Sequence, residues 1–222
     1  WMTREMIDAA GLSTEERAEI DAIVEQPNRW PETPELIWNG RVAPIAGYAA
    51  RGFLWYQGCS NIGQGCYDRL QNSMVRSWRA AWGRGDMPFI YMLLAPYEHG
   101  DKDGRWRPHF VETQMRTASA IPAAWYVPTE TLGSLATIHP GRKQEIADLC
   151  CLRALQNVYG MPTGITIEPP RLQSVEFGDD GTARVTLTDV WSNLGSMSHR
   201  EVTGFELAGA DREFHLAHAE VD

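Results

Sequence analysis

The sequence is poor in positive charge and has no long hydrophobic run. Its 222 residues include 20 Lys and Arg against 29 Asp and Glu, which gives a formal net charge of −9. A chain that binds nucleic acid through phosphate contacts needs basic residues in excess, so we expect no nucleic-acid partner. No apolar stretch approaches the ~20 residues of a membrane-spanning helix, and we expect no membrane partner either.

Cysteine and clustered histidine are also scarce. The four cysteines do not make a disulfide framework in a chain of this length, and we interpret the adjacent Cys150 and Cys151 as small hydrophobic residues. The six histidines are scattered, and His215 and His218 fall on an expected strand with the wrong alternation for joint ligation. Residues 58–65 contain glycines but lack the Lys-Ser/Thr pair of a phosphate-binding loop. The sequence thus predicts no metal site and no cofactor.

A usual beginning is missing as well. The first residue is Trp1, and no signal-peptide pattern follows it. Since a translated chain does not normally begin with Trp, we expect a processed product or a fragment. The lack of a signal peptide then carries no information about export.

The order of apolar patterns predicts three segments. Residues 1–32 are expected to be helical, and Ser13 and Glu16 have the spacing of a capping box. Residues 33–162 alternate expected strands and helices, which is typical of an α/β domain with a parallel sheet. Residues 163–222 contain short runs of alternating apolar and polar residues, which predict a partial antiparallel β unit. These runs are residues 165–168, 173–177, 183–187, 203–207 and 213–217.

The chain is organised around residues 53–61. Residues 53–56 read Phe-Leu-Trp-Tyr and are expected to form a buried strand at the centre of the parallel sheet. Residues 57–61 read Gln-Gly-Cys-Ser-Asn and form the loop at the carboxyl end of that strand, the edge where open α/β sheets bind ligands. On this pattern alone an ordinary strand and turn is the simpler interpretation, and two further motifs favour a site.

Three segments resemble one family of hydrolases. Residues 56–61, Tyr-Gln-Gly-Cys-Ser-Asn, resemble the Tyr-Gln-Gly-Glu-Ser-Asn motif of the sialate O-acetylesterase family, within the SGNH hydrolases. Residues 38–45, Trp-Asn-Gly-Arg-Val-Ala-Pro-Ile, resemble the Tyr-Asn-Gly-Met-Ile-Ala-Pro-Leu segment that precedes this motif. Residues 137–145, Thr-Ile-His-Pro-Gly-Arg-Lys-Gln-Glu, resemble Asp-Ile-His-Pro-x-x-Lys-Gln-Glu. The order matches the family, and the resemblance covers roughly residues 33–222.

The resemblance implies a fold and an activity. The implied fold is a three-layer α/β/α unit of SGNH, flavodoxin-like type, with a parallel sheet over residues 33–162. The implied activity is removal of O-acetyl groups from sialic acid or other glycans, which makes an acetylated glycan the expected substrate partner. The family also suggests a periplasmic, secreted or lysosomal location.

Four residues are candidates for ester hydrolysis. His139, which we expect at the start of a helix on the same sheet edge, is suited to act as general base. Asn61 and the backbone amide of Gly58 are candidate oxyanion donors, and the resemblance gives this role to the corresponding Gly and Asn. Gln57 either positions substrate or satisfies loop amides. We expect Gly58, Asn61 and His139 to line one pocket.

The sequence departs from the family at three points. The family's nucleophilic Ser lies in a Gly-Gln-Ser-Asn-Met motif, and this sequence contains none. The family's carboxylate two residues before the His is Thr137 here, and the Glu of its Tyr-Gln-Gly-Glu motif is Cys59. Glu130, in the loop before His139, is a candidate replacement for the carboxylate that orients the base.

Three hypotheses for the function therefore stay open. In the first, the chain is a fragment or divergent member of an O-acetylesterase, and a second polypeptide or another copy supplies the missing Ser. In the second, it binds acetylated glycans without hydrolysing them. In the third, Cys59 is a thiol nucleophile, although no basic residue closely precedes it. Because a missing strand would expose an apolar sheet edge, we also expect self-association.

Overall fold

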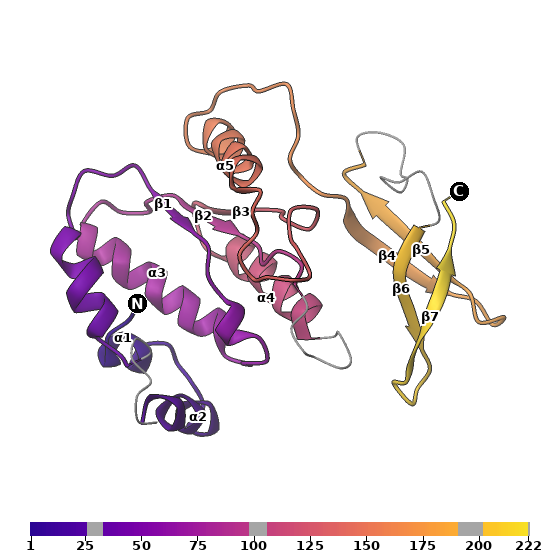
Figure 1. Ribbon diagram of the computed structural model, residues 1–222, viewed down its shortest axis with the longest axis horizontal. Helices are drawn as coiled ribbons and strands as arrows, with labels where there is room; N and C mark the ends of the chain where they lie inside the picture. The colour runs from indigo at the N-terminus through magenta and orange to yellow at the C-terminus, as the bar shows by residue number, and fades with distance from the viewer. Residues whose placement is uncertain (26–32, 98–105, 191–201, 222) are drawn as a thin grey trace. The chain divides into compact units, whose positions relative to one another are not determined.

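The computed structural model describes residues 1–25, 33–97, 106–190 and 202–221 (Figure 1). The chain divides into two compact units, Trp1–Ile167 and Glu168–Asp222. The first unit contains α1 (Arg4–Asp8), α2 (Thr14–Val24), η1 (Trp38–Val42), η2 (Ala43–Ile45), β1 (Phe53–Trp55), η3 (Cys59–Asn61), α3 (Tyr67–Trp82), β2 (Phe89–Met92), α4 (Trp106–Ala120), β3 (Ala124–Val127) and α5 (Lys143–Asn157). The second contains β4 (Arg171–Phe177), β5 (Ala183–Thr188), β6 (Val202–Ala208) and β7 (Phe214–Ala219). The finer domain boundaries at residues 32 and 162 stay predictions.

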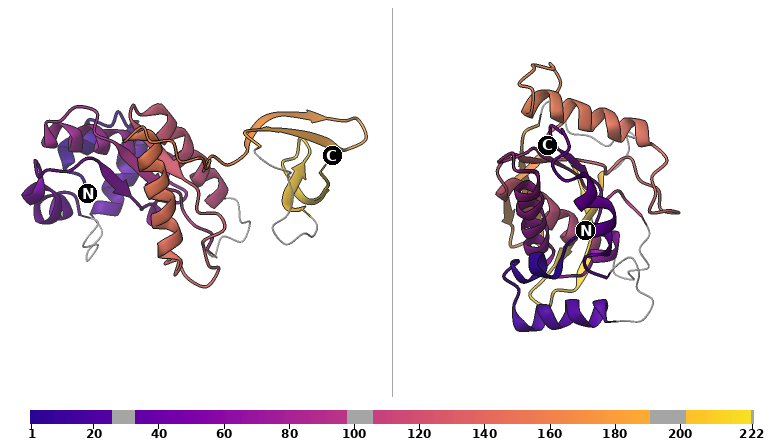
Figure 2. Two further views of the ribbon diagram at one scale, coloured as in Figure 1. Left: turned by 90° about the horizontal axis from the view of Figure 1, so that it is seen from above. Right: turned by 90° about the vertical axis from the view of Figure 1, so that its left-hand side faces the viewer.

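The first unit is built on a three-stranded parallel sheet in the order β1-β2-β3. Phe53 pairs with Phe89, and Phe89 pairs with Ala124. A helix follows each strand, and α3 and α4 cover one face of the sheet while α5 covers the other (Figure 1). In Figure 2, α5 and α2 lie on opposite sides of this unit. The three layers confirm the predicted α/β/α fold with a parallel sheet.

Alternation along the strands sorts the core into two clusters. Phe89 and Tyr91 point toward α3 and α4 and pack with Trp78. Ile90, between them in the sequence, points to the opposite face and packs with Ile146 of α5. The middle strand, β2, is therefore covered on both faces.

The prediction that residues 53–56 form a central, buried strand is wrong. β1 is an edge strand of the described sheet, and Leu54 is 61% exposed. Phe53 and Trp55 point to the other face, where their rings contact Trp78. The cause is the position of α5, which packs across β2 and β3 and leaves its own face of β1 uncovered.

A largely apolar groove of about 360 Å³ lies between β1 and α5. Leu54 and Met92 form its floor on the sheet side, and Ile146 and Cys150 belong to its α5 side. The outer backbone edge of β1 pairs with no other strand among the described residues. This side of the unit thus combines unpaired backbone groups with apolar surface, the two features that favour addition of another strand.

The N-terminal helices pack on the sheet unit through α3. The predicted capping box of α2 is present: the amide of Glu16 donates to Oγ of Ser13 at 3.3 Å, and the amide of Ser13 donates to Oε2 of Glu16 at 2.8 Å. The hydroxyl of Ser73 on α3 donates to the carbonyl of Met6 in α1. The bond from Ser73 joins α1 to the layer that covers β1.

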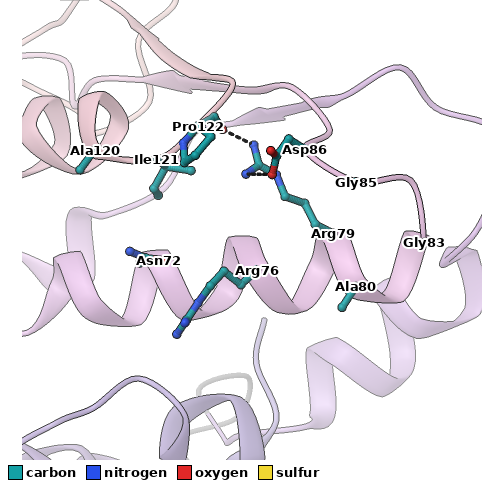
Figure 3. A pocket seen from close by; sticks show the side chains of 10 residues that line it. All are labelled: Asn72, Arg76, Arg79, Ala80, Gly83, Gly85, Asp86, Ala120, Ile121 and Pro122. Atoms are coloured by element: carbon teal, nitrogen blue, oxygen red, sulfur yellow. Dashed lines mark hydrogen bonds and ion pairs between the residues drawn. The ribbon is translucent and has the colours of Figure 1, made fainter.

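At the amino-terminal edge of the sheet, a buried guanidinium ties α3 to the segments that lead into β2 and β3 (Figure 3). Arg79 is only 8% exposed. It donates to the carbonyl oxygens of Met87 at 2.8 Å and Pro122 at 2.7 Å, and lies 3.4 Å from a carboxylate oxygen of Asp86. A groove of about 470 Å³ lies beside it, and Figure 3 shows the side chains around this groove.

The second unit consists of two antiparallel hairpins, β4–β5 and β6–β7, which confirms the predicted partial antiparallel β unit. Asp180 closes the first turn by accepting from the amide of Thr182 at 3.1 Å. Large apolar side chains on both hairpins, among them Phe177 and Leu216, are exposed. The hairpins therefore bury little apolar surface by themselves.

The strand expected at residues 165–168 is absent. The carbonyl of Ile165 accepts a hydrogen bond from the hydroxyl of Thr163 at 3.0 Å, and Ile167 is buried in the apolar cluster beside α5. Two prolines, Pro169 and Pro170, follow and have no amide hydrogen for a β ladder. Alternation alone therefore predicted a strand that does not form, because it does not show whether a segment has a partner strand.

Over the described ranges, no helix has both the length and the apolar character needed to cross a bilayer.

Substitution of Arg79 tests the link at the amino-terminal edge. Arg79→Met should lower the free energy of unfolding by about 2–4 kcal/mol, because it leaves buried carbonyl oxygens without donors. The matched control is Arg76→Met on the exposed side of α3, where the guanidinium donates to the carbonyl of Ala9. This control should cost less than about 1 kcal/mol. Urea unfolding followed by circular dichroism measures both, and equal losses would contradict the structural role of Arg79.

Substitution of Leu54 tests the exposed edge. We expect the chain to self-associate, and Leu54→Lys should weaken association about tenfold or more, because a charge replaces an apolar side chain that association would bury. The control is Leu135→Lys, since Leu135 is 69% exposed but lies outside the groove. Sedimentation equilibrium over a range of concentrations measures the association constant. A monomer at high concentration would refute the expectation, and an equal effect of both substitutions would refute the assignment to this edge.

Candidate active site

The carboxyl ends of the three parallel strands meet at one edge of the sheet, and side chains join the segments that follow them. The hydroxyl of Thr129, after β3, donates to the carbonyl of Leu93, after β2, at 2.6 Å. Further along, the amide of Ser134 donates to the carbonyl of Pro96 at 3.0 Å. The loop after β3, which leads to His139, is therefore fixed against the segment after β2.

The loop after β1 turns sharply at Gly58. Its φ of +142° lies in a region that residues with a Cβ rarely adopt. A Cβ at this position would lie 2.6 Å from Cε1 of Phe110 on α4, so there is no room for a side chain. The turn closes into η3 when the amide of Asn61 donates to the carbonyl of Gly58 at 2.8 Å. Glycine is thus required here by both backbone conformation and packing.

Two N–H groups of this turn, one on the buried Gly58 and one on Asn61, have no acceptor among the described residues. Among the described residues, none accepts a hydrogen bond from the backbone amide of Gly58. The side-chain amide of Asn61 donates to Oε1 of Gln64 at 2.7 Å, and its oxygen accepts from Nε2 of Gln57. A side-chain amide carries two hydrogens, so Asn61 keeps one for another acceptor. The contact with Gln57 holds the Asn61 side chain in place.

His139 lies in a turn, and the expectation that it begins a helix is wrong. α5 begins four residues later, at Lys143, because Arg142 has a non-helical backbone. The amide of His139 donates to Oγ1 of Thr137 at 3.1 Å, which stabilises the turn. The imidazole is exposed and makes no hydrogen bond to any residue that the structure describes. Its place in a common pocket with Gly58 and Asn61 stays a prediction, since the two grooves described above are lined by other residues.

Glu130, the candidate carboxylate for orienting the base, is engaged elsewhere. Both of its carboxylate oxygens accept from the guanidinium of Arg107, at 3.2 and 2.8 Å. Arg107 also donates to the carbonyl of Leu94 at 2.7 Å and to that of Ala95 at 3.3 Å. In this arrangement Glu130 anchors the loop after β3 to the end of β2.

Cys59 is half-buried in η3, directly after Gly58. Burial raises the pKa of its thiol above the ordinary value, which lowers the thiolate fraction at neutral pH. Nearby, burial also raises the pKa of Tyr56, whose ring lies 5.1 Å from Nζ of Lys143. Across the described ranges, no group of three or more His, Cys, Asp or Glu side chains is arranged to hold a metal ion.

The chain is similar to known esterases. It is 23% identical over 201 residues to a sialate O-acetylesterase of Homo sapiens, covering 79% of this chain and 36% of that protein. A sialate O-acetylesterase of Mus musculus is 25% identical over 167 residues, covering 66% of this chain and 30% of that protein. A solved carbohydrate acetylesterase from Xanthomonas citri superposes with a TM-score of 0.74 and 29% identity over 86% of this chain and 45% of its own. No protein-family model matches.

The three-layer unit and this structural match define an α/β fold of the SGNH hydrolase type. Together with the sequence relatives, they support a similarity of the chain to the sialate O-acetylesterases. The matched proteins are acetylesterases, which are carboxylic ester hydrolases. The chain spans less than half the length of the proteins it matches.

Sequence reasoning missed the side chains that hold the edge together. Arg107, Phe110 and Gln114 all project from α4 and contact the strand ends or the Gly58 turn. Their spacing of three and four residues places them on one helix face, which the sequence does show. The sequence does not show which segments that face meets, because those contacts join distant parts of the chain.

Substitution of Gly58 tests the constraint on this turn. Gly58→Ala should lower the free energy of unfolding by about 2–4 kcal/mol, because it adds backbone strain and overlap with Phe110. Gly65→Ala is the control, since a Cβ at Gly65 meets nothing within 4 Å. The double substitution Gly58→Ala with Phe110→Leu should recover part of the loss. Thermal unfolding measures all three, and a harmless Gly58→Ala would contradict the packing described above.

Proposed function

We propose that the chain is part of a carbohydrate O-acetylesterase that removes acetyl groups from sialic acid or other glycans. In this proposal Gly58 and Asn61 donate hydrogen bonds to the oxyanion, Gln57 holds Asn61 in place, and His139 is the general base. The observation that carries it is the unengaged amide of Gly58 beside a fixed Asn61 amide at the carboxyl edge of a parallel sheet.

The proposed reaction is acyl transfer through a serine hydroxyl that this sequence does not supply in the family's motif. The serine oxygen attacks the acetyl carbonyl carbon while His139 takes its proton. The carbonyl oxygen becomes an oxyanion, held by the N–H groups of Gly58 and Asn61. Collapse breaks the bond to the sugar oxygen, which receives the proton from the imidazolium. Water then attacks the acetyl-serine by the same route and releases acetate.

A second polypeptide, or another copy of the chain, would supply that serine. The exposed edge of β1 supports this part of the proposal, because a further strand paired there would end at the same edge as Gly58 and Asn61 if it ran parallel to β1. The apolar groove beside Leu54 would receive its inward side chains.

Binding of acetylated glycans without hydrolysis is the second candidate. It is favoured by the exposed imidazole of His139, which has no orienting carboxylate among the described residues, and by the engagement of Glu130 with Arg107. A thiol mechanism at Cys59 ranks third, because burial raises the pKa of this thiol and leaves it mainly protonated at neutral pH.

The test of the proposed function begins with binding. An O-acetylated sialic acid should shift the amide resonances of Gly58 and Asn61 in an isotope-labelled chain, because the acetyl oxygen accepts from them. The same sugar without the acetyl group is the ligand control, and Gly85 at the opposite edge is the residue control. Shifts that do not depend on the acetyl group would refute the assigned oxyanion site.

Turnover by the chain alone should be very weak. Loss of one member of a hydrolytic triad costs on the order of a thousandfold or more, because its members act together. Acetate release from an activated ester should therefore be near background for the unsubstituted chain, His139→Ala and Cys59→Ala. Robust turnover lost only in His139→Ala would reveal a serine that the sequence did not identify. Robust turnover lost in both variants would favour the thiol mechanism.

A further inference from the structure

Gln114 is the most deeply buried polar side chain of α4, with 1% of its surface exposed. A polar group at such a depth needs partners for both ends of its amide. Oε1 accepts from the backbone amide of Leu94 at 3.0 Å, and Nε2 donates to the backbone carbonyl of Gln57 at 3.1 Å. The side chain therefore joins the end of β2 to the loop after β1.

This bridge begins where backbone pairing stops. The described pairing of β1 with β2 ends at Trp55 and Tyr91. Gln57 and Leu94 lie two and three residues further on, and their backbone groups bind the two ends of one side-chain amide instead of each other. Gln114 thus adds one side-chain bridge between the two strands beyond their last backbone pair.

The bond to Gln57 also fixes the direction of the Gly58 amide. The carbonyl of Gln57 and the N–H of Gly58 belong to the same planar trans peptide, so they point in opposite directions. When Nε2 of Gln114 holds the carbonyl, the N–H of Gly58 points away from Gln114. Because glycine has no Cβ, rotation of this peptide is sterically cheaper at Gly58 than at other residues. Some other group must therefore select its direction.

The other described side chains near this peptide make no hydrogen bond to it. Phe110, one helical turn before Gln114, packs against Gly58 but carries no polar atom. The hydroxyl of Tyr67 bonds to the side chain of Gln57 at 3.5 Å and also interacts with the side chain of Gln114, rather than with this peptide. Burial raises the pKa of Tyr67 to about 12, which keeps the phenol protonated. Gln114 is the described side chain that binds the peptide itself.

We propose that Gln114 is a positioning residue that sets the direction of the Gln57–Gly58 peptide and so aims the Gly58 amide toward substrate. The inference rests on the proposed function only for the use of that amide; the direction of the peptide can be measured without any substrate.

Gln114→Glu is the most direct test, because the new side chain has nearly the same shape. When protonated, its carboxyl group can still donate to the carbonyl of Gln57. When ionised, it repels that carbonyl and attracts the Gly58 amide, so the peptide should rotate. We expect the Gly58 amide resonance to resemble that of the unsubstituted chain at low pH. As pH rises through the carboxyl titration, it should move downfield, and at each higher pH it should exchange with solvent at least about tenfold more slowly than the same amide of the unsubstituted chain at that pH, because it gains a buried acceptor.

Thr117→Val is the matched control. Thr117 is buried on the same helix, but its hydroxyl donates within α4, to the carbonyl of Thr113, at 2.7 Å. This variant removes a buried hydrogen bond without touching the Gly58 turn, and the Gly58 amide should behave as in the unsubstituted chain. A Gly58 amide that is unchanged at every pH in Gln114→Glu, or changed equally in Thr117→Val, would overturn the inference.

Two further measurements separate this inference from the proposed function. A scalar coupling across the hydrogen bond from Nε2 of Gln114 to the carbonyl carbon of Gln57 should be present in the unsubstituted chain, and its absence would overturn the inference even if Gln114→Glu does not fold. Acetate is the probe for the oxyanion site. The change in chemical shift that acetate causes at the Gly58 amide should be at least about tenfold smaller in Gln114→Glu at high pH than in the unsubstituted chain. If acetate has no effect on the unsubstituted chain while the peptide still rotates in Gln114→Glu, the inference holds and the proposed function fails.

Discussion

The arrangement of the candidate site depends on how the chain satisfies backbone groups where the parallel ladder ends. Beyond β2, the carbonyls of Leu93, Leu94 and Pro96 and the amide of Leu94 all bind groups outside the ladder. A buried peptide group without a hydrogen-bond partner lowers the stability of the fold, so these side-chain and loop contacts are required for stability. They bring the loops after β1 and β3 to the end of β2. These contacts therefore determine where the candidate oxyanion donors and the loop with His139 lie.

Local patterns in the sequence predict much of the fold. The apolar spacing before Gly83 predicts α3, and Gly83 does end that helix in a left-handed conformation with φ of +64°. The turn at Asp180 and the alternation on either side of it predict the first hairpin. The edge position of β1 could not be predicted in this way, because an apolar run reports what a strand can bury and not how many partners it has. Residues 165–168 show the same limit, since alternation cannot specify a partner strand.

Some features of the candidate site could also be predicted from neighbouring residues, and others could not. The glycine and amide of residues 58 and 61 follow from a motif of neighbouring residues, and the backbone of Gly58 shows why glycine is needed there. The place of Glu130 in the loop before His139 makes it a candidate for orienting the base. In the structure it forms an ion pair with Arg107 instead, and this pair depends on the position of α4 across the strand ends. Contacts of this kind join residues more than 20 positions apart, and the charges alone do not identify the pairs.

The shared face of α4 has a mechanical consequence. Arg107 binds the end of β2 and, through Glu130, the loop that leads to His139, while Phe110 and Gln114 bind the Gly58 turn. These attachments span two turns of one helix, whose internal hydrogen bonds keep their spacing constant. Any sliding or tilting of α4 would therefore carry both loops along together, so the edge would adjust to a ligand as one rigid body rather than loop by loop.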